Sequence, residues 1–153
     1  MTPGFRRRGP EVDLDLTPEE AELLALALPL LAAAPPGVPG GPPARYPVFR
    51  AYPGDDAAEA RFRELTAGSL EADREGDRRR FAASLERGTL GAEDAAAWLR
   101  VLAGARLALA ARLGVPELGW EGVAPGPGLA LAHLFGCVQD ELATALLPAA
   151  GRP

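Results

Sequence analysis

The side chains that could carry chemistry are few in this chain of 153 residues, which contains one Cys and one His. A structural metal centre needs about four Cys, His or carboxylate ligands, and a catalytic triad needs a His beside its nucleophile. His133 has only Cys137, four residues later, as a further His or Cys, which is too few for such a centre, and neither Ser69 nor Ser84 has a base next to it. The glycine-rich stretches lack the Gly-Lys-Ser/Thr pattern that holds phosphate. We therefore expect neither an enzyme nor a metal or cofactor site.

The single cysteine, Cys137, is a candidate thiol with two readings. It follows Gly136 and precedes Val138, which the helical pattern places inward, so we expect a small buried apolar side chain. The nearby Asp140 and Glu141 oppose a second negative charge and so disfavour a reactive thiolate. Redox sensing by this thiol is the alternative.

Two runs of three arginines are the only basic runs in the chain. Because a guanidinium pairs with phosphate in a bidentate manner, either run could contact nucleic acid or a partner. Acidic residues between positions 71 and 77 flank the second run, so a solvated helix face with ion pairs is the alternative there. A net charge of −5 argues against coating nucleic acid through bulk charge. The candidate contact residues are Arg6, Arg7, Arg8, Arg78, Arg79 and Arg80.

One charged residue falls on the apolar side of a predicted helix. Arg106 lies between Ala105 and Leu107, and a charged group in that position must find polar partners or extend to the edge of the core. The nearest polar candidates follow on the last predicted helix. The sequence therefore predicts a buried polar network made of Arg106, Gln139, Asp140 and Glu141.

Two strongly periodic segments predict the helices that must position these groups. The first covers residues 93–113, ends before Gly114, and has apolar residues spaced by four, three, four and four at Trp98, Leu102, Ala105, Leu109 and Leu113. The second covers residues 129–147, and its inward residues are expected to be Leu131, Leu134, Phe135, Val138, Leu142 and Leu146. Two such helices can pack antiparallel against each other.

Earlier helices are predicted from their capping signals. Thr17-Pro18-Glu19-Glu20 supplies a hydroxyl N-cap, a proline in the first turn and a glutamate at the third position, so a helix begins here and bends or ends near Pro29. Asp55 or Asp56 would cap a further helix towards Gly68, and a separate charge-rich segment at 70–87 would follow.

The remaining segments complete the predicted fold. Val12, Leu14 and Leu16 alternate with acidic residues, which predicts a strand that pairs with residues 5–8 in a short N-terminal β-ribbon. Proline and glycine dominate loops near 35–44 and 115–128. We expect a mainly α chain, with an extended segment at 1–16 and a single-domain helical bundle at 17–148. Because no secretory signal and no apolar run of about 20 residues is present, we also expect a cytoplasmic protein without a membrane partner.

The order of short motifs resembles a known family of actinobacterial proteins, domain of unknown function 2017, also called the oxidative-stress transcriptional regulator AosR family. The matching stretches lie between about 17 and 147 and are Leu16-Thr17-Pro18-Glu19-Glu20, Pro47-Val48-Phe49-Arg50-Ala51-Tyr52, Phe62-Arg63-Glu64-Leu65, Ala97-Trp98-Leu99, Arg106-Leu107-Ala108-Leu109 and Val138-Gln139-Asp140-Glu141-Leu142.

The resemblance implies a cytoplasmic helical protein that regulates transcription under oxidative stress. It would act without enzymatic activity, through a protein partner and also through DNA if the arginine runs contact it. The redox activity implied by the family name depends on two neighbouring cysteines, and one Cys cannot form that bridge, so we expect no intramolecular disulfide switch. Genes of this family often lie beside an adaptor of the Clp protease. An adaptor or scaffold linked to Clp proteolysis is therefore the alternative function, and the oligomeric state stays open.

Overall fold

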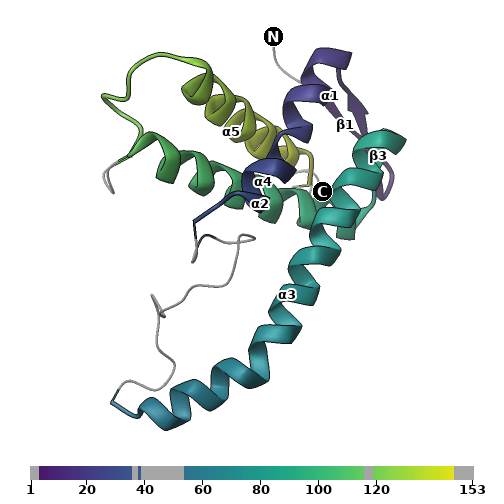
Figure 1. The fold of residues 1–153 in the computed structure, drawn as a ribbon. Helices are drawn as coiled ribbons and strands as arrows, with labels where there is room; N and C mark the ends of the chain where they lie inside the picture. Colours follow the sequence, from purple (N-terminus) through teal and green to yellow (C-terminus); the bar gives the residue numbers. More distant parts are fainter. Residues whose placement is uncertain (1–3, 36–37, 39–53, 116–118, 147–153) are drawn as a thin grey trace, which may run out of the picture.

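The computed structural model describes residues 4–35, 38, 54–115 and 119–146, which form five helices and one three-stranded sheet. Figure 1 shows their arrangement. In chain order, the elements are β1 (Gly4–Arg8), β2 (Glu11–Asp15), α1 (Pro18–Ala25), α2 (Ala27–Ala32), α3 (Asp56–Arg87), β3 (Thr89–Leu90), α4 (Ala92–Leu113) and α5 (Pro127–Leu146). The mainly helical fold class predicted from the sequence is confirmed.

The predicted N-terminal ribbon is present. β1 and β2 pair antiparallel, with Phe5 opposite Leu14, and Gly9 takes the positive φ of 59° that the tight turn between them requires. The structure adds a third strand, because β3 pairs with β2 and places Leu90 opposite Val12. The sequence pattern does not predict β3, since two residues are too few to show an alternating pattern.

The first helix is divided at a different place from the one predicted. Its start is as expected: Glu20 N donates to Thr17 Oγ1 over 3.1 Å, and Thr17 N donates to Glu20 Oε1 over 2.9 Å. The helix stops at Ala25, however, and α2 begins at Ala27. Pro29 therefore lies in the first turn of α2, where a missing amide hydrogen breaks no helical hydrogen bond. The predicted break near Pro29 is wrong by about one turn.

α3 is one continuous helix from Asp56 to Arg87, not two segments separated near Gly68. Asp55 caps it by accepting from Ala58 N over 3.1 Å, and Gly88 ends it with a φ of 85°. A glycine inside a helix costs only about 1 kcal/mol relative to Ala, so Gly68 does not stop the helix. The C-terminal end of α3 lies against the other helices, and its N-terminal part extends away from them (Figure 1).

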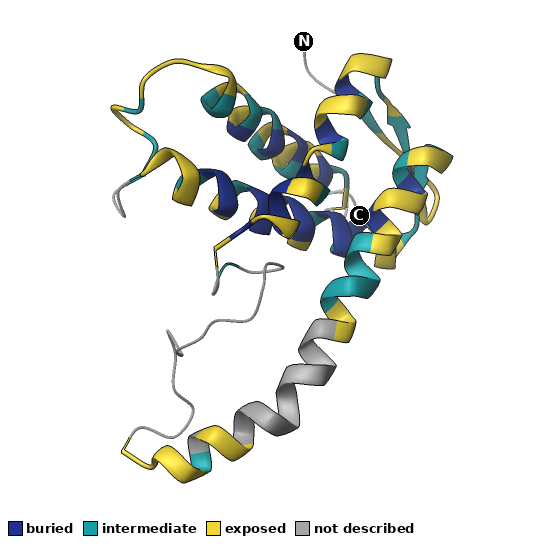
Figure 2. Cartoon of the chain, viewed as in Figure 1, coloured by how far each residue is buried: buried dark blue, intermediate teal, exposed yellow. Residues whose placement is uncertain are grey.

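α4 is the central helix, and its buried residues contact α5, α2 and the end of α3. Figure 2 shows the buried residues concentrated on α4 and on the sides of α2 and α5 that face it. The predicted inward residues Phe135, Val138 and Leu142 of α5 are buried as expected, whereas Leu113 and Leu146 at the helix ends are exposed. None of the described helices combines the length and apolar character needed to cross a bilayer.

The predicted loops can be followed only in part. The proline- and glycine-rich segment at 35–44 lies almost entirely outside the described residues. In the loop at 115–128, residues 119–126 have no helix or strand, and α5 then begins at Pro127, two residues earlier than predicted.

Candidate functional site

An apolar groove lies where α1 and α2 meet the end of α4 and the start of α5. It has a volume of about 670 Å³. Leucines supply most of its large side chains, so we call it the leucine groove. The leucines that line it are Leu23, Leu26, Leu30, Leu109, Leu131 and Leu134. A helix–helix junction that closed completely would leave no space of this size, so these helices leave part of their apolar surface uncovered.

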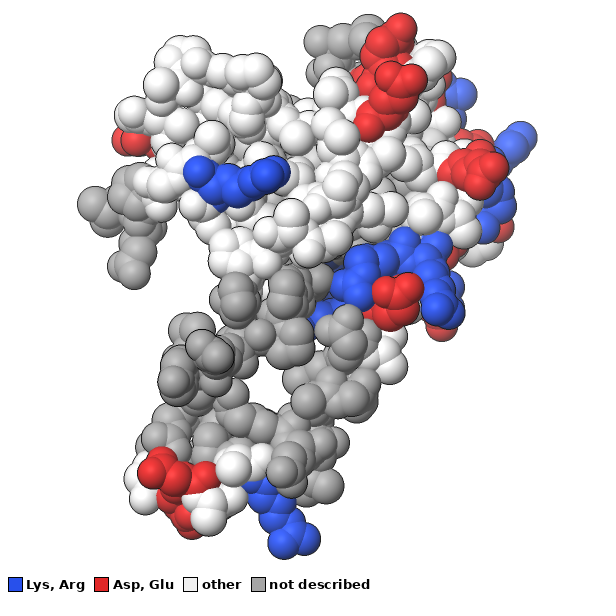
Figure 3. All heavy atoms as spheres, viewed as in Figure 1, with Lys and Arg blue, Asp and Glu red and all other residues white. Residues whose placement is uncertain are grey.

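Two leucines make the groove accessible. Leu23 is 43% exposed and Leu26 is 42% exposed, and Leu26 is the residue at which α1 and α2 separate. Among the residues that the structure describes, Arg112 is the only charged one that lines the groove. Figure 3 shows a broad uncharged face over α2 and α4 on which one basic side chain stands alone. The groove therefore offers apolar contact area beside one positive charge.

A glycine brings α5 close to α4 at the end of this groove. A Cβ atom at Gly128 would lie 3.0 Å from Leu113 Cδ1, which is closer than such contacts normally come. The absence of a side chain at Gly128 lets the first turn of α5 pack on the last turn of α4.

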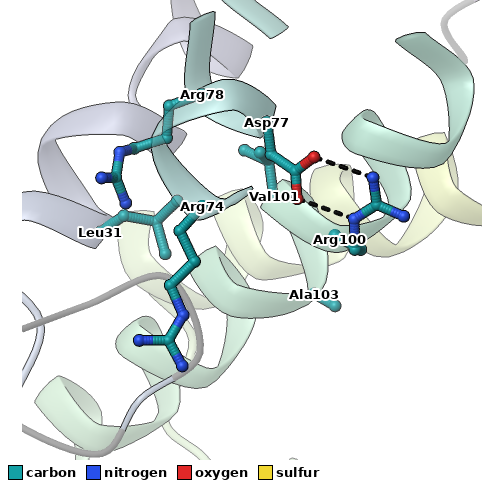
Figure 4. A pocket seen from close by; sticks show the side chains of 7 residues that line it. All are labelled: Leu31, Arg74, Asp77, Arg78, Arg100, Val101 and Ala103. Atoms are coloured by element: carbon teal, nitrogen blue, oxygen red, sulfur yellow. Dashed lines mark hydrogen bonds and ion pairs between the residues drawn. The ribbon is translucent and has the colours of Figure 1, made fainter. Parts of the chain in front are cut away.

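A second hollow, of about 240 Å³, lies between α2, α3 and α4. We call it the arginine cleft, because its lining contains three guanidinium groups and one carboxylate; the lining residues are Leu31, Arg74, Asp77, Arg78, Arg100, Val101 and Ala103. Figure 4 shows Asp77 facing Arg100, whereas Arg74 and Arg78 extend from α3 on the side of Leu31.

Ion pairs fix two of the three arginines. Arg100 donates from Nε and Nη2 to the two oxygens of Asp77 over 2.7 and 2.8 Å, and this pair joins α4 to α3. The hydrogen bonds to Asp77 raise the pKa of the Arg100 guanidinium above its ordinary value. Arg78 donates to Glu75 over 2.9 Å, and Arg79 donates to the other oxygen of the same carboxylate over 3.2 Å. These two hydrogen-bonding partners lower the pKa of Glu75.

The second predicted arginine run does not form one continuous contact surface. Arg78 lines the cleft, Arg79 points to solvent with its side chain 79% exposed, and Arg80 reaches across to α4. Arg80 forms ion pairs with Glu93 over 2.6 Å and with Asp94 over 3.3 Å. The expected partial neutralisation by neighbouring acidic residues is therefore present, and it also includes two carboxylates from α4 that are distant in the sequence.

The first arginine run lies on β1. Arg6, Arg7 and Arg8 are exposed there. Arg8 lies 3.5 Å from Asp13 of β2, and Arg7 Nε donates to Gly9 O over 3.3 Å. The run is thus held in an ordered strand at the edge of the sheet.

The predicted polar network around Arg106 is present in part. Arg106 Nη1 donates to Gln139 Oε1 over 3.1 Å, and Gln139 Nε2 donates to Leu99 O over 3.4 Å. Asp140 and Glu141 are exposed and make no contact with Arg106, so their assignment to the network was wrong. Successive residues of a helix point about 100° apart, and only Gln139 has the rotation that faces α4. Arg106 Nε is buried without a hydrogen-bond partner.

The structure corrects the expectation for the cysteine. Cys137 is exposed, although its neighbour Val138 is fully buried. His133 on the same helix is also exposed, as expected of a surface residue. Among the described residues no three His, Cys, Asp or Glu side chains gather closely enough to hold a metal ion.

Arg74 and Arg100, which complete the arginine cleft, were not predicted from the sequence. Arg74 and Arg78 are four residues apart, so a helix over this segment places both on one face. That spacing could have indicated them, but the contribution of Arg100 depends on how α4 packs against α3.

One comparison with known proteins gives a match. The family model described as "Domain of unknown function (DUF2017)" matches residues 1–146. No curated protein and no solved structure matches the chain.

Proposed function

This chain belongs to the DUF2017 family, and on that premise we propose that it is a non-enzymatic regulatory protein that binds an apolar helical segment of a partner protein in the leucine groove. The observation that carries this proposal is the exposure of Leu23 and Leu26 inside a groove of about 670 Å³. Exposed apolar surface that gathers in one concave area is typical of protein interaction sites.

The lining of the groove indicates what kind of segment it would accept. An amphipathic helix presents apolar residues along one face, and a groove lined by leucines of α1, α2, α4 and α5 offers apolar surface to such a face. Burying one leucine of each partner would contribute about 1.5–3 kcal/mol per side chain before the cost of association. Arg112 at the edge favours a segment that carries a carboxylate next to its apolar face.

A regulatory role is the finer part of the proposal, and the resemblance to the AosR family supports it. The regulation would act mainly through the partner, because Arg79 and Arg80 are engaged with Glu75, Glu93 and Asp94. The exposed run of Arg6, Arg7 and Arg8 on β1 is the surface left for direct DNA contact. With a single cysteine, it would also proceed without an intramolecular disulfide.

Two matched variants test the groove. Leu26→Asp places a charge in the groove, whereas Leu107→Asp changes a leucine that is 50% exposed on α4 and does not line it. In affinity purification from the native cell followed by cross-linking and mass spectrometry, the wild type and Leu107→Asp should retain the same partner, with cross-links beside the groove. Leu26→Asp should lose it while keeping its melting temperature.

Three outcomes would count against the proposal or redirect it. Equal retention by both variants would show that the partner binds elsewhere. A partner that is a component of the Clp system would favour the adaptor function over regulation of transcription. A gel shift of the protein's own upstream DNA at low salt would redirect the proposal to direct DNA contact.

A further inference from the structure

We propose that the N-terminal part of α3 in one copy of this chain docks in the leucine groove of a second copy. Two chains would then form a two-fold dimer in which each groove is covered by a helix of the other chain. We call residues 56–72 of α3 the helical arm. This inference rests on the proposed function, which makes the leucine groove a docking site, and it names what covers the groove when no partner protein is bound.

The helical arm lies beyond the part of α3 that is packed on the rest of the fold. α3 contacts α4 through Asp77, Phe81 and Ser84. From residue 72 back to its start at Asp56, the helix extends away from the other described helices (Figure 1). At about 1.5 Å per residue, the arm is about 25 Å long. Because an isolated helix of this size is only marginally stable in water, the arm gains stability from a surface on which it can pack.

The order of residues in the arm is that of an amphipathic helix. Ala58, Phe62 and Leu65 follow one another at spacings of four and three, and residues at these spacings share one face of a helix. Ala60 falls on the opposite face. The arm therefore has an apolar face that spans about two turns, which is how a helix enters an apolar groove.

The charges of the arm and the groove are complementary. Residues 56–72 contain four acidic residues and two arginines, so the arm has a net charge of −2. Glu59 directly follows Ala58 and so falls at the edge of the apolar face. Among the described residues, the groove has one charged residue in its lining, the basic Arg112. The arm is thus a segment of the kind that Arg112 favours, with a carboxylate next to its apolar face.

The arm cannot reach the groove of its own chain. α3 is continuous from Asp56 to Arg87 and its C-terminal end is packed on α4, so the arm is directed away from the groove that α1, α2, α4 and α5 form (Figure 1). Every copy carries one arm and one groove. A two-fold arrangement fills both grooves and closes the assembly at two chains.

The size of the contact indicates how strong the dimer is. One third of the surface of a helix about 10 Å wide and 25 Å long is about 260 Å². Two arms in two grooves, with both partners counted, would bury about 1,000 Å², which is the lower limit for a specific interface. We therefore expect a reversible dimer with a Kd of about 10 μM, which a partner that binds the groove more tightly would separate.

Sedimentation velocity of the purified full chain, from about 1 to about 100 μM, tests the dimer. The wild type should change from monomer to dimer over this range. Leu65→Asp in the arm and Leu26→Asp in the groove should each weaken association at least about tenfold. Ala60→Asp is the matched control, because Ala60 is exposed on the opposite face of the arm, and its Kd should stay within about twofold of the wild type. Melting temperatures establish that all three variants remain folded.

A pair of opposite charges tests which surfaces meet. The double variant with Leu26→Asp and Leu65→Arg places a carboxylate in each groove and a guanidinium on each arm. It should associate about tenfold more tightly than Leu26→Asp alone, because each buried carboxylate then has a partner from the other chain.

Several results would overturn the inference. These are a wild type that stays monomeric over the whole range, equal association of Leu65→Asp and Ala60→Asp, undiminished association of Leu26→Asp, or no recovery in the double variant. Growth beyond two chains would also do so, since it contradicts the closed two-fold arrangement.

Failure of the dimer and failure of the proposed function give different results. A monomeric wild type whose cellular partner is still lost by Leu26→Asp overturns the dimer alone. A dimer that separates in Leu26→Asp, while this variant retains the cellular partner, overturns the proposed function alone.

Discussion

The two sides of α4 are held by different kinds of contact. On the side of α3, Trp98 Nε1 donates to Ser84 Oγ over 2.8 Å, and the Ser84 hydroxyl in turn donates to the carbonyl oxygen of Arg80. Phe81 packs on the Trp98 ring with centroids 4.6 Å apart, and all three of these side chains are fully buried. On the side of α5, Arg106 reaches Gln139, but its Nε atom is buried without a partner.

This difference shows which polar contact specifies the packing. Every polar atom of the Trp98 and Ser84 pair has a partner inside the core, so the pair fixes one position of α3 on α4. The Arg106 contact is incomplete, and its guanidinium lies beside Gly136, where a Cβ atom would be 3.4 Å from Arg106 Cζ. Arg106, the charged residue on an apolar helix face, therefore contributes less to fixing the helix packing than Trp98, which the sequence pattern presents as an ordinary core residue.

The largest expected effect breaks the contact on the side of α3. Ser84→Ala leaves Trp98 Nε1 buried without an acceptor, so the free energy of unfolding should fall by about 1–3 kcal/mol in urea denaturation. In a Trp98→Phe background the same Ser84→Ala change should have much less effect, because no indole N–H remains to be satisfied. A loss below about 0.5 kcal/mol in the wild-type background would contradict this assignment.

A smaller effect is expected on the side of α5. Arg106→Met removes the hydrogen bond to Gln139 but also removes the buried Nε that lacks a partner. The free energy of unfolding should change by less than about 1 kcal/mol in either direction, because an apolar chain of similar length can replace an incompletely paired buried charge. A loss larger than that of Ser84→Ala would reverse the ranking of the two sides.

The smallest effect concerns the ion pairs on the exposed surface of α3. Because Arg78 and Arg79 lower the pKa of Glu75 from its ordinary value of 4.5, its charged form is favoured in the folded state. This contribution to stability is present above pH 4.5 and is lost as the pH falls through the lower folded value.

The variant Glu75→Gln measures this contribution. Its melting temperature should lie slightly below that of the wild type at neutral pH, and the two should converge in more acidic solution. Glu86→Gln is the matched control, since Glu86 lies on the same helix and has no ion-pair partner among the described residues. A gap that widens at acidic pH would contradict the assigned direction of the pKa change.

Local signals in the sequence predicted much of the helical framework. The hydroxyl and carboxylate of Thr17 and Glu20 specify a helix start by themselves, since their partners are backbone amides within the same turn. The periodic leucines likewise placed α4 within one residue of its observed start. In contrast, β3 and the continuity of α3 through Gly68 were missed, because a two-residue strand is held by its neighbour and a glycine only weakens a helix.

The candidate site residues were harder to predict from the sequence than the helices and strands. Cys137 and Val138 are adjacent, yet one is exposed and the other fully buried. In the same way, Gln139 faces α4, whereas its neighbours Asp140 and Glu141 are exposed. A helical pattern gives the relative rotation of side chains but not the position of the edge of the buried face, which depends on the neighbouring helix.

The sequence by itself determined that this chain is mainly helical, carries an N-terminal ribbon and has one Cys and one His. These conclusions rest on residue types and on contacts within a few residues. Only the tertiary structure decided that Arg74, Arg78 and Arg100 share one cleft and that leucines from four helices leave a groove open. The physical reason is that both hollows are gaps between packed helices, and their shape depends on distances between residues far apart in the chain.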